Sequence, residues 1–296
     1  MYLSAREIAK KWNMSERRVR ILCMTKRISG AFLSGYQWLV PVDAVKPADG
    51  RRKKAESPIE TIDGKKKRLD ACRPLTAGEA DRLAEDFAVE YVFNSGAISG
   101  NALTLRETDL VLRGLTVGDK SLKDHIEVIG HRDAFCFVRK KAEEKQPLTE
   151  ELIRQIHSFI PADKKDGGVY RCLPARVVGT KATPIPPSEI EERMKQAIDV
   201  YQNGTEHIVS RLARLHLEFE TIRPFADGNG RTGRLITNYE LMKAGFPPID
   251  ISVSDQKAYR NAFDAYAEKG SVSVMEDLFI RCLNESLDLR LKIFGE

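Results

Sequence analysis

The 296-residue chain is poor in cysteine and has no long apolar run, and each shortage argues against a class of protein. Its five cysteines are scattered and never form a CxxC pair, which argues against a disulfide framework or a zinc site and favours a reducing, cytoplasmic compartment. No apolar run approaches the ~20 residues of a membrane-spanning helix. The first residues lack the apolar core of a signal peptide, and no repeat of solenoid length is visible. We therefore expect neither a membrane protein nor a repeat protein.

The remaining composition is that of a folded protein with an uneven charge. Hydrophobic residues make up 42% and charged residues 31% of the chain, which is enough for one large or two modest domains. The net charge is +5, yet residues 1–54 hold 13 Lys and Arg against 4 Asp and Glu, whereas the rest is slightly acidic. This uneven distribution of charge predicts that the basic N-terminal segment, residues 1–54, contacts a polyanion.

Residues 1–50 have the pattern of a small helical domain with a hairpin. Ser4 and Glu7 form a capping box for a first helix, and Ser15 is the expected N-cap of a second. Gly-punctuated, aromatic and β-branched residues at 30–41 then predict a two-stranded hairpin or wing. Apolar residues at helical spacing are expected to face inward: Ile8, Trp12, Val19, Leu22 and Cys23. The order predicts a winged helix-turn-helix.

Residues 51–77 are charged, contain Gly and Pro, and are poor in large apolar side chains. This composition predicts a linker or an edge segment. Its two basic clusters, residues 51–54 and 65–68, are either solvated or extend the polyanion-binding surface, and the residues alone leave both readings open.

From residue 78 onward the apolar period is helical, so the fold class is mainly α, a helical bundle. Val- and Thr-rich residues from Tyr170 to Thr183, followed by a Pro-rich end, predict a β-hairpin flap over 170–187. The expected helices are 78–94, 104–112, 121–142, 149–158, 187–202, 206–222, 229–244, 255–268 and 272–291.

The loop between two of these helices, residues 223–234, carries the most specific chemistry. Gly228 and Gly230 permit backbone angles that let successive N–H groups converge on an anion, and the following helix adds its positive end. Arg231 and Arg234 lie on that helix's first turn, and Asp227 supplies a carboxylate of the kind that phosphate-bound Mg²⁺ takes as ligand. The pattern favours a di- or triphosphate site with Mg²⁺ over the alternative, a helix-capping turn whose arginines form surface ion pairs.

At these residues the chain resembles the Fic (Fido) family, whose motif is HPFx(D/E)GNGRxxR between two helices. The resemblance covers about residues 80–290 and implies a Fic domain over 78–296. Fic proteins usually transfer AMP from ATP to a Ser, Thr or Tyr hydroxyl of a target protein. The resemblance implies that Asp227 binds Mg²⁺, that Gly228, Asn229 and Gly230 hold the α- and β-phosphates, and that Arg231 and Arg234 hold the distal ones. It further implies that a target segment adds as a strand to the flap at Val177, Val178, Gly179 and Thr180.

Two positions depart from the family pattern. The first motif residue is Arg223 instead of the His that acts as general base, and arginine cannot accept a proton near neutral pH. The inhibitory helix pattern (S/T)xxxE(G/N) is matched at 95–101 by Ser95, Gly100 and Asn101, but Ser99 replaces the Glu that pairs with the second motif arginine. Arg234 is therefore expected to be free for the γ-phosphate of a bound nucleotide. Loss of both the general-base histidine and the inhibitory glutamate predicts a pseudoenzyme that still binds ATP and Mg²⁺ and transfers AMP weakly or not at all.

Three alternatives remain open for this domain. One is an active adenylyltransferase with a non-standard base, and another is an interaction scaffold or transcriptional regulator with an empty nucleotide site. In the third, Arg223 adds a phosphate contact for different chemistry.

The basic N-terminal segment, residues 2–50, resembles the winged helix-turn-helix domains of excisionase and MerR type. That resemblance implies DNA binding through residues 1–54, with the second helix of the motif in the major groove. A protein-docking role for the same basic face stays open, and homo-oligomers are compatible with both resemblances. The implied DNA contacts are Ser15, Arg17, Arg18, Arg20, Lys26 and Arg27.

Overall fold

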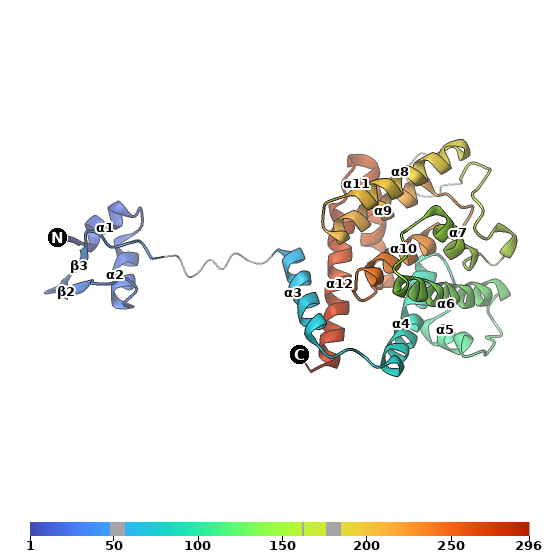
Figure 1. Cartoon of the computed structure of the whole chain (residues 1–296), viewed down its shortest axis with the longest axis horizontal. Helices are drawn as coiled ribbons and strands as arrows, with labels where there is room; N and C mark the ends of the chain where they lie inside the picture. The colour runs from blue at the N-terminus through green and yellow to red at the C-terminus, as the bar shows by residue number, and fades with distance from the viewer. Residues whose placement is uncertain (48–56, 162, 176–184, 296) are drawn as a thin grey trace. The chain divides into compact units, whose positions relative to one another are not determined.

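The computed structural model describes residues 1–47, 57–161, 163–175 and 185–295. The chain divides into two compact units, residues 1–56 and residues 57–296 (Figure 1). Each unit has a separate hydrophobic core, and each is described by itself below.

The small unit is two helices and a three-stranded antiparallel sheet with strand order β1-β3-β2. Tyr2 pairs with Pro41 in one ladder, and Phe32 pairs with Leu39 in the other. The expected capping box is present, since Glu7 N–H donates to Ser4 Oγ and Ser4 N–H donates to the Glu7 carboxylate. The elements are β1 (Tyr2–Ser4), α1 (Ala5–Lys11), α2 (Glu16–Met24), β2 (Phe32–Ser34) and β3 (Gln37–Pro41).

The core of the small unit contains the side chains that the sequence predicts to face inward. Ile8, Trp12, Val19, Leu22 and Cys23 are all buried, together with Val40 of β3. The sheet therefore closes one side of the two-helix layer. Tyr36, at the hairpin turn, is fully exposed.

The large unit is a helical bundle, and its helices lie within a few residues of those expected from residue 78 onward. Among the described residues, no helix is both long and apolar enough to cross a bilayer. The helices are α3 (Pro58–Ala71), α4 (Ala77–Ile98), α5 (Leu105–Leu112), α6 (Leu122–Glu143), α7 (Glu150–Ser158), α8 (Ile190–Asn203), α9 (Ile208–Ile222), α10 (Asn229–Lys243), α11 (Gln256–Lys269) and α12 (Ser273–Ile293), with short 3₁₀ turns at Lys164–Asp166, Pro187–Glu189 and Val253–Asp255.

The linker predicted over residues 51–77 is wrong for residues 58–71, which form α3 and pack against α12 (Figure 1). Ser57 caps this helix with Glu60 in a capping box, and Pro58 occupies its first turn. Ile62 is fully buried in the main core, and Lys65 pairs with Asp288 of α12 over 2.5 Å. The charged composition concealed the helix because α3 buries only a narrow apolar stripe.

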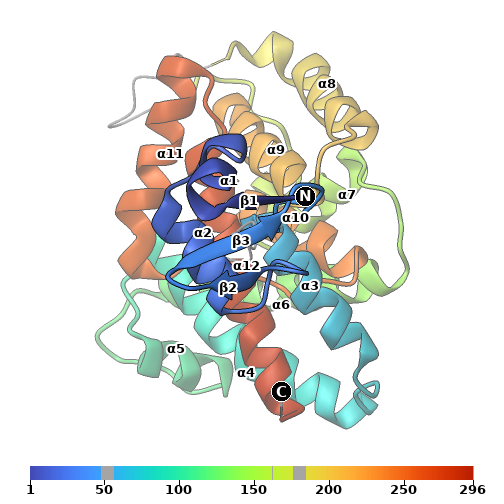
Figure 2. The same ribbon diagram turned by 90° about the vertical axis from the view of Figure 1, so that its left-hand side faces the viewer.

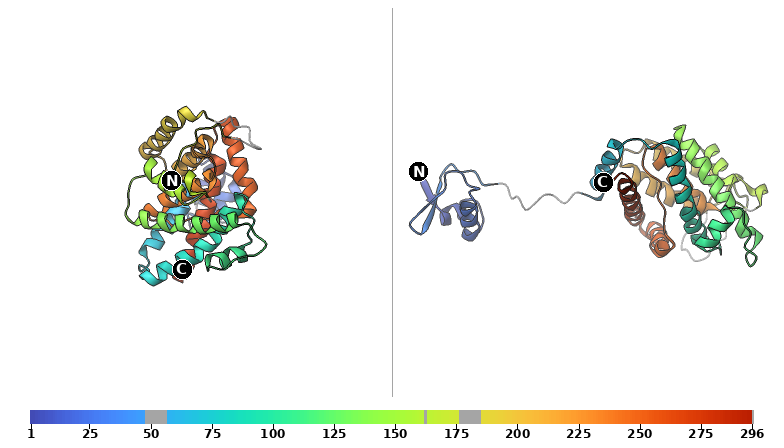
Figure 3. Two further views of the ribbon diagram at one scale, coloured as in Figure 1. Left: turned by 90° about the vertical axis from the view of Figure 1, so that its right-hand side faces the viewer. Right: turned by 90° about the horizontal axis from the view of Figure 1, so that it is seen from below.

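Helix α10 lies in the interior of the large unit, where it contacts α4, α6, α7 and α9 (Figure 2 and Figure 3). Nearly every residue from Asn229 to Leu241 is buried. The Gly-rich loop that precedes it therefore continues directly into a buried helix, and this attachment fixes the position of the loop.

The β-hairpin expected over 170–187 is not seen in the part of it that the structure describes. Residues 170–175 and 185–186 form no strand, and 176–184 lie outside the described residues. The target contacts implied for Val177, Val178, Gly179 and Thr180 fall in that gap and stay a prediction.

Candidate functional site

The site begins where α9 ends. Arg223 closes α9 in a left-handed conformation, φ 47° and ψ 65°, and its N–H still donates to Phe219 O over 2.9 Å. A non-glycine residue rarely adopts this conformation, and Pro224 cannot continue the helix. The chain therefore turns sharply at the residue where the family motif starts.

Asn229 shapes the loop that follows. Its side-chain oxygen accepts from Phe225 N–H over 3.0 Å, and its amide donates to Phe225 O over 2.9 Å. The Asn229 side chain is thus used within the loop, and any phosphate contact from this residue would come from its backbone N–H.

Gly228 is required by both conformation and space. Its φ is +76°, and a Cβ at this position would lie 2.7 Å from Ile160 Cγ2. It is followed directly by α10, where Thr232 N–H and Oγ1 both donate to Gly228 O. The first amides of a helix have no intrahelical acceptor and carry its positive dipole end. The loop therefore presents an anion-binding surface of backbone N–H groups.

The loop lines a cavity of about 650 Å³ between the ends of α4, α9 and α10 and one face of α11. Its walls contain the predicted Asp227 to Arg231 segment, Arg234 and Arg223. They also contain residues that were not predicted: Glu220, Gln256, Lys257, Tyr259, Arg260, Asn261, Phe263 and Asp264.

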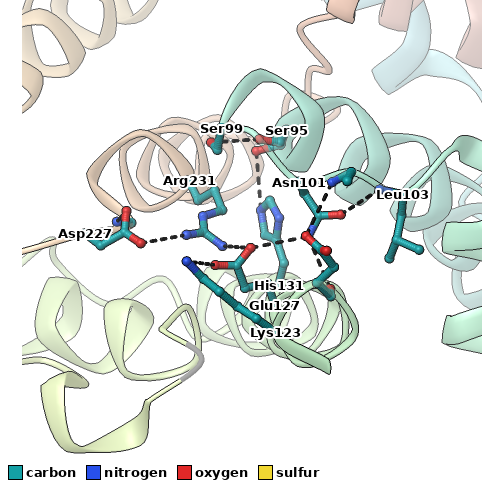
Figure 4. A network of polar contacts seen from close by, with 12 residues as sticks. Ser95, Ser99, Asn101, Leu103, Lys123, Glu127, His131, Asp227 and Arg231 are labelled. Carbon is teal, nitrogen blue, oxygen red and sulfur yellow. Dashed lines mark hydrogen bonds and ion pairs between the residues drawn. The ribbon is translucent and has the colours of Figure 1, made fainter. Parts of the chain in front are cut away.

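Arg231 is buried and lies between two carboxylates (Figure 4). Its Nη1 lies 3.3 Å from Glu127 Oε2, and its Nη2 lies 3.7 Å from Asp227 Oδ2. Asn101 supports Glu127 by donating its side-chain amide to Oε2 over 3.3 Å. The Arg231 Nε is buried and has no hydrogen-bond partner among the described residues. An anion in the cavity could complete this arrangement.

Arg234 pairs with no carboxylate among the described residues and is held by neutral acceptors, so that its availability to the γ-phosphate stays a prediction. Its Nε donates to Ser95 Oγ over 2.7 Å, and its Nη2 donates to Ser95 O over 2.7 Å and to Ser99 Oγ over 2.8 Å. Its Nη1 donates to Tyr259 OH over 3.1 Å. A hydroxyl accepts a hydrogen bond as a carboxylate does, so that Ser99 retains the contact without neutralising the charge.

Gly100 and Asn101 follow at the end of α4. Gly100 has φ +95°, and the Asn101 amide also reaches Asp124 O over 3.2 Å. Ser95, Ser99 and Asn101 thus lie together near Arg231 (Figure 4), and Ser95 and Ser99 also contact Arg234.

Glu220 is a carboxylate of the cavity that the sequence did not single out. Its Oε1 is buried without a hydrogen-bond partner among the described residues, and it lies 3.2 Å from where a Cβ on Gly230 would be. Burial raises the pKa of Glu220, while the nearby Arg223 and Arg234 act in the opposite direction. It was missed because one acidic residue on a helix face carries no pattern.

None of the five histidines, all within the described residues, is among those that line the cavity. His216 packs in the core as predicted, and burial lowers its pKa to about 3. His157 stacks on Phe225, donates from Nε2 to Asp227 O over 3.0 Å, and accepts from Gly168 N–H at Nδ1. Burial lowers its pKa to about 4. A neutral His157 therefore supports the back of the loop.

Asp227 is suited to a metal that arrives with phosphates. Its Oδ1 accepts from Gly228 N–H over 2.6 Å, and its side chain is 70% exposed towards solvent. The described residues contain no group of three or more His, Cys, Asp and Glu that could hold a metal alone. A single exposed carboxylate fits Mg²⁺, which is usually bound by one or two carboxylates together with substrate phosphates.

In the small unit, the residues implied for DNA contact belong to α2 and the turn after it. Ser15 caps α2 by accepting from Arg18 N–H. Arg17, Lys26 and Arg27 are exposed, and Arg20 pairs with Glu16 over 2.5 Å.

The comparisons with known proteins concern the same residues. A family model described as the Fic/DOC family matches residues 147–241, which contain α7 to α9, the loop and α10 as far as Leu241. The protein adenylyltransferase Fic of Drosophila melanogaster is 29% identical over 257 residues, 84% of this chain and 50% of that protein. The chain spans about half the length of the curated relatives it matches.

Two solved structures extend the comparison to the fold. Fic-1 from C. elegans, as a variant, is 26% identical with a TM-score of 0.69, and the match covers 79% of this chain and 71% of that one. A Fic domain containing signaling protein from Bacteroides thetaiotaomicron is 30% identical with a TM-score of 0.70, over 80% of this chain and 96% of that one. At this identity and coverage, and with the loop itself inside the matched region, the chain belongs to the Fic/DOC family.

Proposed function

We propose that the large unit binds ATP with Mg²⁺ in the cavity between α9, α10 and α11 and transfers AMP to protein hydroxyls weakly or not at all. The α10 amides, Arg231 and Arg234 would bind the phosphates. Asp227 would hold the Mg²⁺, which neutralises phosphate charge when bound. The proposal is supported by the unpartnered Arg231 Nε and by the excess of cations in the cavity wall.

The observation that carries the loss of transfer is the identity of residue 223. For a hydroxyl to attack the α-phosphorus and displace pyrophosphate, its proton must pass to a base. An arginine side chain is not a proton acceptor near neutral pH, so Arg223 cannot take this proton. Its side chain lines the cavity and is half-buried, so that Arg223 would bind phosphate as a further cation instead.

A second candidate function, an active adenylyltransferase with another base, is favoured by Glu220. Glu220 lines the cavity, its Oε1 is buried without a hydrogen-bond partner among the described residues, and burial raises its pKa, which favours a carboxylate that accepts a proton. In that case the hydroxyl proton would pass to Glu220 while pyrophosphate leaves.

Calorimetry with ATP and Mg²⁺, followed by labelling with ATP marked on the α-phosphate, tests these candidates. Binding without labelling of the protein or of a lysate supports the first proposal. Robust labelling that Glu220→Gln abolishes supports the second. Absence of binding would contradict both and would favour an interaction scaffold.

We also propose that the small unit is a winged helix-turn-helix that binds DNA through α2 and the turn after it. The support is the net basic charge of residues 1–54 and the exposure of Arg17 and Lys26. In the full chain, Arg17→Ala should weaken DNA binding and reduce its salt dependence by about one released ion. Arg6→Ala, an exposed arginine on α1, is the matched control. Equal effects of the two variants, or no binding by the wild type, would contradict the proposal.

A further inference from the structure

Arg171 makes an unusual set of contacts with the end of α9. Its Nε donates to Arg223 O over 2.7 Å, and its Nη2 reaches Ile222 O over 3.3 Å. Its backbone N–H donates to Pro224 O over 2.9 Å. One residue thus binds three consecutive carbonyls at the point where the motif begins.

The same guanidinium also binds carbonyls from two other places in the chain. Nη1 donates to Leu173 O over 2.9 Å, and Nη2 donates to Ile185 O over 2.6 Å. Arg171 therefore ties together residues 171–173, residue 185 and residues 222–224. A lysine has a single donor group and cannot reproduce this planar pattern.

The hydrogen-bond partners of this buried cation among the described residues are all neutral. Arg171 is 7% exposed, and each of the four side-chain hydrogen bonds that it forms with described residues goes to a backbone carbonyl. The last carbonyls of a helix lack intrahelical donors and form its negative dipole end. The end of α9 thus supplies the opposing partial charge. Burial lowers the pKa of Arg171, and repulsion by Arg223 lowers it further.

These contacts bear directly on Arg223. Its backbone is left-handed, a conformation that persists only when the surroundings enforce it. Arg171 holds the Arg223 carbonyl and the carbonyls on both sides of it. The direction in which the Arg223 side chain leaves the backbone is fixed by the same contacts, and that side chain lines the cavity.

We propose that Arg171 is a positioning residue that holds Arg223 in its left-handed conformation and so directs the Arg223 guanidinium at the phosphates of a bound nucleotide. This inference rests on the proposed nucleotide binding. Arg171 acts through Arg223 and does not itself line the cavity.

A double-mutant cycle read by calorimetry with ATP and Mg²⁺ tests the inference on the full chain. Arg171→Lys, which keeps the charge, and Arg223→Ala should each weaken ATP binding by about tenfold, the effect of one charge-assisted hydrogen bond. In the Arg223→Ala background, Arg171→Lys should have almost no further effect. Arg139→Ala, which removes an ion pair with Asp81 away from the cavity, is the control.

Equal losses from Arg171→Lys in both backgrounds would overturn the inference, because a general loss of structure does not depend on Arg223. Chemical rescue is an additional readout: millimolar guanidinium should restore binding to Arg171→Ala but should not change Arg139→Ala.

Hydrogen exchange of residues 219–227 tests the positioning without any ligand. Arg171→Lys should speed exchange of the Arg223 amide, which is bonded to Phe219 O, and leave α12 unchanged. If the wild type binds no ATP, the proposed function fails, and this measurement still decides the positioning. Unchanged exchange at residue 223 would overturn it.

Discussion

The Arg234 guanidinium donates to the Ser99 hydroxyl over 2.8 Å. The residue at the inhibitory position therefore still contacts the second motif arginine, as a neutral acceptor instead of an anion. Two substitutions at this position separate the geometry of the contact from its charge.

Ser99→Glu should weaken ATP binding by about tenfold or more, because the new carboxylate would pair with Arg234 and compete with phosphate. Ser99→Ala should leave ATP affinity within about threefold of the wild type, since it removes one neutral acceptor of several. Calorimetry measures both. Similar affinities for the two variants would contradict the assignment of Arg234 to phosphate binding.

Arg223→His should raise AMP transfer by about 10²-fold or more, the usual contribution of a general base. Histidine also tolerates the left-handed conformation of this position better than most residues. Labelling with α-phosphate-marked ATP measures the gain. The matched control is Arg223→His with Asp227→Ala, which should stay unlabelled. No gain from the single variant would show that more than the base is missing.

Asn229→Ala should lower the free energy of unfolding by about 2–3 kcal/mol, because it leaves the buried N–H and C=O of Phe225 without partners. Asn261→Ala, at an exposed position of the same cavity, should change stability by less than about 0.5 kcal/mol. Urea unfolding measures the difference. Equal effects would mean that the Asn229 bonds contribute nothing net.

Asp250 should make stability depend on pH in weakly acidic solution. Burial raises its pKa to about 6, Asn94 donates to its Oδ2 over 2.5 Å, and its Oδ1 has no partner among the described residues. The folded state therefore binds the proton more tightly than the unfolded state. This stabilisation is present below about pH 4 and is lost as the pH rises through 6.

Asp250→Asn removes this titration. Relative to the variant, the wild type should lose at most about 3 kcal/mol between pH 4 and 7, the equivalent of two pKa units. Urea unfolding at several pH values tests it, with Asp264→Asn as a control on α11. Parallel pH profiles for Asp250→Asn and the wild type would contradict the prediction.

The sequence predicted the helices well where apolar residues recur at helical spacing, and it predicted the loop because the loop's glycines and arginines are adjacent in the chain. It failed for α3, where only a narrow stripe around Ile62 is buried among charges. The charged composition of this segment therefore reflects the solvent-facing side of α3 and gives no sign of the side that packs against α12.

The missed residues of the site have a different cause. Glu220 and Arg171 act through contacts with residues distant in sequence or on another helix, and neither belongs to a local pattern. The Ser99 contact does not follow from the lost charge, because charge is only one part of the interaction with Arg234. A hydroxyl keeps the hydrogen bond that the charge would have strengthened.

Burial of α10 has a consequence for how this protein can change over time. Asn229, Arg231, Thr232 and Arg234 are each less than 5% exposed and form hydrogen bonds or ion pairs inside the bundle. Replacing these side chains would leave buried partners without hydrogen bonds and lower stability, whether or not the protein transfers AMP. Retention of GNGRxxR is thus a requirement of stability as much as of chemistry, and its presence alone is no measure of turnover.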